Sequence, residues 1–170
     1  TGLKSLGSQI GSLDQEMTNL KASASPDFSE IIEEAIKSVV TIKTDISQGS
    51  GFIIADGGYV VTNAHVMEGA RAADIITYDG KVHKVSKIGE NSEIDITLLK
   101  IEDESYEPLN LENSDEVQIG EKVIAIGNPL GLQFSVSEGI VSAIHREGEN
   151  KLKVYIQTDA PLNPGNSGGP

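Results

Sequence analysis

From Val39 onward the chain consists of short apolar, largely β-branched runs that are separated by turn signals, without intervening helical patterns. Asp56-Gly57-Gly58 and Asp79-Gly80 are typical of tight turns, and each lies between two apolar runs, as in a β-hairpin. The predicted strands cover residues 39–42, 51–55, 59–62, 74–78, 81–88, 94–101, 122–126, 134–144 and 152–156. Short strands at this spacing predict an all-β sandwich or barrel and disfavour a parallel α/β sheet.

The length of 170 residues favours one domain, or one domain with an appendage, and is enough to bury a sizeable core. The chain contains no cysteine. That excludes disulfide scaffolds, thiolate zinc sites, iron–sulfur sites and cysteine nucleophiles. No window approaches 18 consecutive apolar residues, so we predict no transmembrane helix.

The net charge of −13 argues against partners that are themselves strongly negative, namely nucleic acid and anionic lipid. Residues 90–121 hold eleven acidic side chains and one basic side chain, Lys100. We interpret this stretch as a solvated acidic surface, and the alternatives are a cation site or a basic partner.

The first 22 residues carry a different pattern, a heptad repeat over three heptads. Its apolar positions are Leu3, Leu6, Ile10, Leu13, Met17 and Leu20. Gly7 and Gly11 each cost about 1 kcal/mol of helix propensity, so the helix needs a partner surface. We predict a self-associating coiled coil, and the alternative is a helix that docks on its own domain or frays.

A linker is indicated at residues 22–26, so we assign residues 1–25 to a helical heptad segment with its linker. Asp27 with Glu30 fits a helix N-cap and its capping-box partner, which predicts a short helix over about residues 28–37.

Ser167 lies in Gly165-Asn166-Ser167-Gly168-Gly169, which fits the Gly-x-Ser-x-Gly nucleophile elbow of α/β-hydrolases. That fold places its acid and histidine after the serine, whereas only three residues follow Ser167, and the preceding strands do not alternate with helices. The α/β-hydrolase interpretation therefore fails. The other common order of a catalytic triad is His, then Asp, then Ser.

Two residues upstream of Ser167 fit that order. His65 follows the predicted strand 59–62, and Asp95 stands at the head of the apolar run that ends at Ile101. A buried carboxylate costs several kcal/mol unless it is paired, so Asp95 should be exposed or bonded to a donor, which could also be a backbone amide. Taken alone, His65 would favour a structural role, since histidines at strand ends are often only structural. We expect the other histidines, His83 and His145, to be exposed surface residues.

His65, Asp95 and Ser167 each lie in one of six motifs whose types and order together resemble the HtrA/Deg family of chymotrypsin-like serine proteases. The resemblance covers roughly residues 28–170. The motifs are Gly49-Ser50-Gly51-Phe52, Thr62-Asn63-Ala64-His65-Val66, Asp95-Ile96-Thr97-Leu98-Leu99-Lys100, Gly127-Asn128-Pro129-Leu130-Gly131, Val136-Ser137-Glu138-Gly139-Ile140-Val141-Ser142 and the segment 157–170 that ends in Asn163-Pro164-Gly165-Asn166-Ser167-Gly168-Gly169-Pro170.

The resemblance implies an all-β, chymotrypsin-like double β-barrel with its site between the barrels. His65 would be the general base, Asp95 its orienting carboxylate and Ser167 the nucleophile, and the amides of Gly165 and Ser167 would form the oxyanion hole. Such catalysis needs no metal and no organic cofactor. The implied function is a serine endopeptidase that degrades unfolded or damaged proteins, and the alternative is a non-catalytic, holdase-like or scaffold oligomer.

The resemblance also implies an extracytoplasmic location and a homo-oligomer, with a trimer favoured. The chain opens with Thr1 and stops at Pro170, whereas family members continue with strands that complete the second barrel and often with PDZ domains. We therefore expect residues 26–170 to be a protease domain that is truncated after the nucleophile motif. A membrane anchor and a PDZ domain are expected outside this sequence, and the fragment as given could be inactive.

Overall fold

The computed structural model describes residues 28–131 and 133–170, so the heptad segment and the predicted cap at Asp27 lie outside the described residues. The chain divides into two compact units between Glu33 and Glu34. A helix, α2 (Ser29–Ala35), crosses this boundary and is followed by a 3₁₀ turn, η1 (Ile36–Ser38). The short helix predicted over residues 28–37 is therefore confirmed. None of the helices within the described residues has the length and apolar character needed to cross a membrane.

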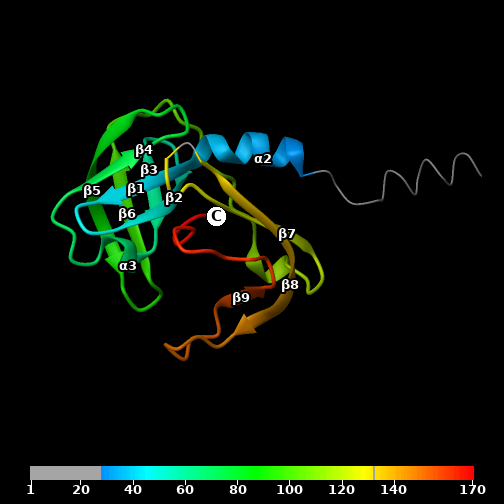
Figure 1. Ribbon diagram of the computed structural model, residues 1–170. Helices are drawn as coiled ribbons and strands as arrows, with labels where there is room; N and C mark the ends of the chain where they lie inside the picture. The colour runs from blue at the N-terminus through cyan, green and yellow to red at the C-terminus, as the bar shows by residue number, and fades with distance from the viewer. Residues whose placement is uncertain (1–27, 132) are drawn as a thin grey trace, which may run out of the picture. The chain divides into compact units, whose positions relative to one another are not determined.

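Six strands of the second unit close into a β-barrel in the order β1-β2-β3-β6-β5-β4 (Figure 1). They are β1 (Val39–Thr44), β2 (Gln48–Ala55), β3 (Tyr59–Thr62), β4 (Ala73–Ile76), β5 (Val82–Asn91) and β6 (Ile96–Ile101). A one-turn helix, α3 (Ala64–Met67), follows β3 directly. All neighbouring strands run antiparallel. The predicted all-β class and both predicted hairpins, β2–β3 and β4–β5, are confirmed.

The alternation of side chains along β6 shows why these sequences form a barrel. Thr97, Leu99 and Ile101 are buried, whereas the residues between them are less covered. This two-residue period directs one face of the strand into the barrel. The core cluster consists of residues from the barrel strands, α3 and the segment after β6: Val40, Ile42, Ile53, Val60, Val66, Ile75, Leu99, Ile101 and Tyr106.

The β2–β3 turn needs glycine at one position. Gly58 has a φ of +77°, and a Cβ there would lie 2.5 Å from the carbonyl oxygen of Ile101. The same glycine accepts a hydrogen bond from the Ile101 amide through its own carbonyl. A side chain would therefore separate the turn from the end of β6.

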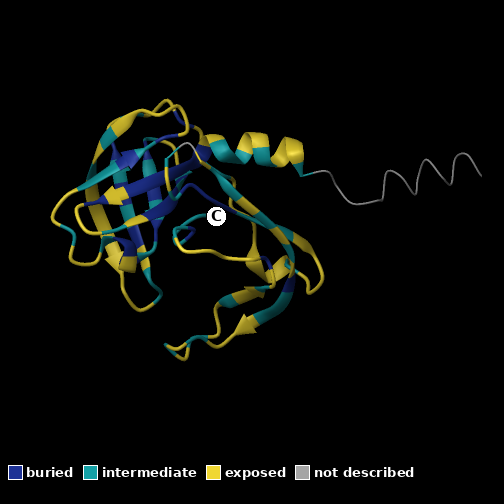
Figure 2. Ribbon diagram, in the orientation of Figure 1, coloured by how far each residue is buried: buried dark blue, intermediate teal, exposed yellow. Residues whose placement is uncertain are grey.

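The remaining strands form a three-stranded antiparallel sheet, β7 (Lys122–Gly127), β8 (Ser135–Arg146) and β9 (Tyr155–Thr158). The predicted strand at 152–156 begins later than expected, at Tyr155. A short 3₁₀ turn, η2 (Ser114–Glu116), lies between β6 and β7 in the chain. Figure 2 shows dark blue, buried segments concentrated in the barrel, whereas the sheet is mostly teal and yellow.

Candidate active site

His65 and Asp95 are brought together by the pairing of two barrel strands. His65 lies in α3 directly after β3, and Asp95 lies in the turn directly before β6. Because β3 and β6 are antiparallel neighbours with Thr62 opposite Thr97, the end of one strand lies beside the start of the other. Two residues that are 30 positions apart in sequence therefore meet at the rim of the barrel.

The Asp95 carboxylate contacts both the ring and the backbone of His65. Its Oδ2 lies 2.6 Å from His65 Nδ1, and its Oδ1 accepts a 2.9 Å hydrogen bond from the His65 amide. A carboxylate only accepts hydrogen bonds, so Nδ1 carries the proton. In the neutral imidazole that leaves the lone pair on Nε2. Both side chains remain about half exposed, at 52% for His65 and 44% for Asp95.

Asp95 occupies a turn rather than the strand itself, which differs from the predicted head of a strand. Its φ of +58° lies in the left-handed region, where aspartate is among the more tolerated non-glycine residues. Its carbonyl oxygen accepts hydrogen bonds from Asn63 Nδ2 at 2.9 Å and from the Ala64 amide at 3.1 Å. The segment before α3 thus holds the unusual backbone geometry of Asp95.

Ser167 lies in a tight loop between the buried Asn166 and Gly168. The Asn166 amide donates to the Asn163 carbonyl at 3.0 Å, and the Gly169 amide donates to the Asn166 carbonyl at 2.9 Å. Strand β2 binds this loop from outside, because the Ser50 amide donates to the Ser167 carbonyl at 2.9 Å. The fold therefore fixes the backbone on both sides of the serine.

Glycine is required at two positions of this loop. Gly165 has a φ of +94°, and a Cβ there would lie 2.3 Å from Pro129 Cβ. Gly168 has a φ of +85°, and its Cβ would lie 2.3 Å from both the Ser50 carbonyl oxygen and Thr62 Oγ1. The loop therefore packs directly against β2, β3 and the segment after β7, which only glycine allows.

Within residues 28–131 and 133–170, neither the Gly165 nor the Ser167 amide donates a hydrogen bond. These two N–H groups thus have no acceptor in that part of the chain. In the same part of the chain Ser167 Oγ has no hydrogen-bond partner, and His65 reaches Asp95 but not Ser167. The structure thus joins two of the three predicted catalytic side chains by hydrogen bonds, and it leaves the third unbonded.

A cavity of about 500 Å³ opens beside the His65–Asp95 pair. Its wall includes Met67, Glu68, Lys87 and Glu90. The hydrogen bond from Lys87 Nζ, followed by that from Ser92, holds the pKa of Glu90 below its ordinary value. This wall is polar and charged, and it adjoins the imidazole.

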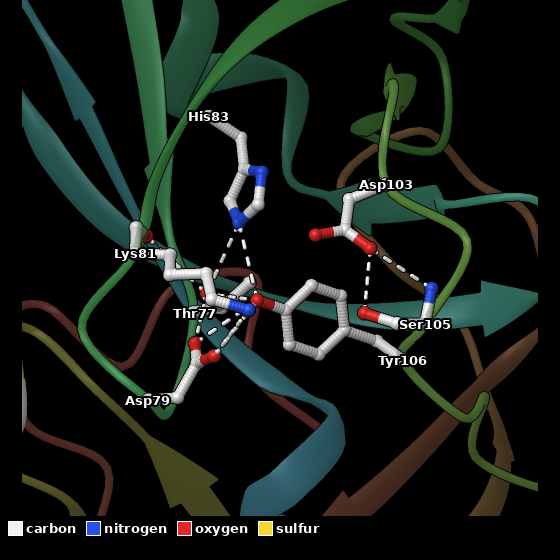
Figure 3. Close-up of polar contacts among 7 residues, drawn as sticks. All are labelled: Thr77, Asp79, Lys81, His83, Asp103, Ser105 and Tyr106. Carbon is white, nitrogen blue, oxygen red and sulfur yellow. Dashed lines mark hydrogen bonds and ion pairs between the residues drawn. The ribbon is translucent and has the colours of Figure 1, made fainter.

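The remaining histidines differ from each other. His145 is exposed, as predicted, but the prediction for His83 is wrong because His83 is half-buried. Its Nε2 lies 3.2 Å from Thr77 Oγ1 and 3.3 Å from the Tyr106 hydroxyl (Figure 3). Tyr106 also donates to Asp79 Oδ1 at 3.0 Å.

This cluster joins the β4–β5 turn to the segment after β6. The hydrogen bond from Thr77 holds the pKa of Asp79 well below its ordinary value, with further bonds from Lys81 and Tyr106 in the same direction. The sequence indicated only a turn at Asp79-Gly80. Its partner Tyr106 is more than twenty residues away, and no local pattern marks that contact.

Comparisons with known proteins agree with this arrangement. The family model of the trypsin-like peptidase domain matches residues 49–170. A DegP-like periplasmic serine endoprotease of Chlamydia trachomatis is 44% identical over 131 residues, which are 74% of this chain and 26% of that protein. Its counterpart in Halomonas elongata is 45% identical over 125 residues, with 73% and 26% covered.

Among solved structures, an HtrA-type protease, AlgW with a tripeptide, matches with a TM-score of 0.79 and 36% identity, over 85% of this chain and 50% of that one. The resemblance to HtrA/Deg proteases and the chymotrypsin-like fold are thereby confirmed. The chain spans about a quarter of the length of the two curated relatives. Because the family model covers well over half of the sequence, the chain belongs to the family of trypsin-like peptidase domains.

Proposed function

We propose that this chain carries the catalytic centre of an HtrA-type serine endopeptidase, with His65, Asp95 and Ser167 as its triad. The observation that carries the proposal is the 2.6 Å contact between His65 Nδ1 and Asp95 Oδ2, with a second bond from the same carboxylate to the His65 amide. This geometry favours the imidazole tautomer that a general base needs. The relatives named as serine endoproteases support the same assignment.

In the first step His65 Nε2 takes the proton of Ser167 Oγ while that oxygen attacks the carbonyl carbon of the scissile peptide bond. The carbonyl π pair moves onto oxygen and gives a tetrahedral oxyanion. The amides of Gly165 and Ser167 would donate to this oxyanion, which is consistent with their lack of acceptors within the described residues. Asp95 stabilises the imidazolium that forms.

The oxyanion then collapses, the carbon–nitrogen bond breaks, and the imidazolium gives its proton to the leaving amine. This leaves an ester between Ser167 and the acyl part of the substrate. Water, with its proton taken by His65, attacks the ester and releases the carboxylic acid and the free serine. Apart from water and the substrate, all groups in this cycle are side chains or amides of the chain itself.

A serine-directed phosphonate tests the assignment, because it reacts with an activated serine and not with an ordinary hydroxyl. We expect the native protein to be labelled at Ser167. Ser167→Ala should abolish both labelling and casein hydrolysis, since loss of a triad nucleophile costs on the order of 10⁶-fold in kcat. Ser114→Ala, at an exposed serine of η2, is the matched control. A Ser167→Ala protein that retains a tenth of the parental activity contradicts the proposal.

One observation favours the alternative function, a non-catalytic binding protein on a protease fold: no hydrogen bond joins His65 to Ser167 within the described residues. Such bonds often tighten only when substrate binds. The same labelling experiment separates the two functions. A pseudo-protease would bind unfolded protein without reacting with the phosphonate.

We also propose a location, a substrate class and an oligomeric state for the protein. Relatives named periplasmic serine endoproteases support an extracytoplasmic location and protein substrates. We further propose that the heptad residues 3–20 assist a homo-oligomer, a trimer being favoured. Sedimentation of Leu6→Asp with Leu13→Asp tests that role, and a mass and dilution behaviour equal to those of the parent would contradict it.

A further inference from the structure

Ser50 lies in the middle of β2, is completely buried, and uses all of its polar groups. Its hydroxyl donates to the Gly165 carbonyl at 2.7 Å and accepts from the Asn128 amide at 2.8 Å. Its own amide donates to the Ser167 carbonyl at 2.9 Å. Its carbonyl oxygen accepts from Thr62 Oγ1 at 2.7 Å.

The hydroxyl has only one orientation that satisfies both neighbours. An amide N–H can only donate, so the bond from Asn128 fixes the hydroxyl as the acceptor there and as the donor toward Gly165. Because the site is fully buried, no solvent molecule replaces either partner. Ser50 therefore joins three segments that are distant in sequence: β2, the residue after β7, and the loop around the serine nucleophile.

The two carbonyls that Ser50 binds lie within the nucleophile loop, one on Gly165 and one on Ser167 itself. Gly165 and Ser167 are also the residues whose amides are proposed to form the oxyanion hole. Their carbonyls are anchored on β2, while their N–H groups have no acceptor within residues 28–131 and 133–170. Anchoring one side of a short loop limits how far its other polar groups can turn. The approach of Pro129 to Gly165 restricts the same loop from the side of β7.

From this arrangement we infer that Ser50 is a positioning residue of the oxyanion hole. It acts through the carbonyls of Gly165 and Ser167 and does not touch the substrate. The inference rests on the proposed function, because the oxyanion hole is part of that proposal. A role in positioning predicts a loss in kcat per active site, whereas a purely structural role predicts only a smaller fraction of folded, active protein.

The test compares Ser50→Ala with Thr44→Val in the native protein. Thr44 is a buried barrel residue whose hydroxyl bonds, among the described residues, only within its own turn, to Ser47 and the Ile46 amide. Its loss therefore controls for the removal of a buried hydroxyl. Phosphonate titration counts the active sites, and kcat and KM are measured per titrated site. We expect Ser50→Ala to lower kcat by about 10- to 100-fold, less than the loss of a whole oxyanion donor. KM should change less than about threefold, and Thr44→Val should leave both constants near the parental values.

Ser50→Cys is the second variant, for the case that the alanine protein does not fold. The thiol is similar in shape but is a weak hydrogen-bond donor, so kcat should fall between those of serine and alanine. Affinity for a peptide boronate, which mimics the tetrahedral oxyanion, should fall with kcat in each variant.

A Ser50→Ala or Ser50→Cys protein with parental kcat per titrated site overturns the inference and leaves the proposed function standing. Equal loss of kcat in Thr44→Val also overturns it, since the effect would then not depend on the loop. Failure of the parent to react with the phosphonate, or activity that persists in Ser167→Ala, contradicts the proposed function instead.

Discussion

The closed barrel and the β7–β9 sheet bury their apolar side chains to different extents (Figure 2). The core cluster lies within the barrel and the segment directly after it, and most of its members have no exposed surface. In the sheet, Ile126 and Val141 are buried, whereas Val136, Ile140 and Ile156 are 39%, 40% and 43% exposed. The barrel thus has its own apolar core, and the sheet has much less.

The candidate site has two parts, the His65–Asp95 pair and the Ser167 loop, and only the first belongs to the closed barrel. The His65–Asp95 pair is held by β3, β6 and α3, all of which belong to the closed barrel. The Ser167 loop follows β9 and is held by bonds to β2 and by the amide of Ile126 in β7, which donates to the Pro170 carbonyl. The base and its carboxylate therefore come from one closed barrel, and the nucleophile depends on bonds between separate segments.

The largest expected effect in the barrel is on the His65–Asp95 pair. Asp95→Asn should reduce kcat on a peptide substrate by about 10⁴-fold, the size of the equivalent change in trypsin, because the amide favours the wrong imidazole tautomer. Asp74→Asn is the control, since Asp74 forms a surface ion pair with Lys84. A mild effect at Asp95 with a severe one at Asp74 would show that the wrong carboxylate has been assigned.

Next in size is the effect on the barrel core. Leu99 is completely buried in β6, so Leu99→Ala should lower the free energy of unfolding by about 2–5 kcal/mol through lost burial and the cavity left behind. Chemical denaturation followed by circular dichroism measures this difference. A loss below about 1 kcal/mol would mean that the barrel core repacks around the smaller side chain.

A smaller effect is expected at the polar cluster of the barrel, and it depends on pH. Since the folded protein holds the pKa of Asp79 below its unfolded value of about 3.9, the carboxylate stabilises the fold above that pH and loses its contribution as the pH falls. Asp79→Asn should therefore cost about 1–3 kcal/mol near neutral pH and progressively less below about pH 4. Thermal unfolding at neutral and acidic pH measures the difference, and a cost that does not change with pH contradicts this account.

The sequence predicted the barrel better than it predicted the contacts between segments. Short β-branched apolar runs and turn signals located the strands, apart from a later start of the last one, because these signals are local. The position of His65 after a strand was also predicted. Asp95 was expected at the head of a strand, but it lies in the turn before Ile96. The sequence did not indicate this turn, because it depends on bonds from Asn63 and Ala64 that only the fold supplies.

Ser50 and Tyr106 illustrate what the sequence could not indicate. Ser50 stood in a recognised motif, Gly49-Ser50-Gly51-Phe52, but its bonds reach residues 78 and 115 positions away. Tyr106 bonds to the β4–β5 turn, and this contact makes His83 half-buried rather than exposed. Such roles follow from contacts between segments that are distant in sequence, which no local pattern encodes.

The smallest expected effect belongs to the sheet. Ile140 in β8 is 40% exposed, and its amide and carbonyl bond to Asp159 and Thr158 whatever its side chain is. Ile140→Ala should therefore cost less than about 1 kcal/mol of unfolding free energy, well below Leu99→Ala. Val141→Ala is the matched control. The Val141 side chain, next to Ile140 in the chain, is 1% exposed, so its truncation should cost more unfolding free energy. If Ile140→Ala is as costly as Leu99→Ala, Ile140 is covered in solution, and the sheet has more of a core than its exposure indicates.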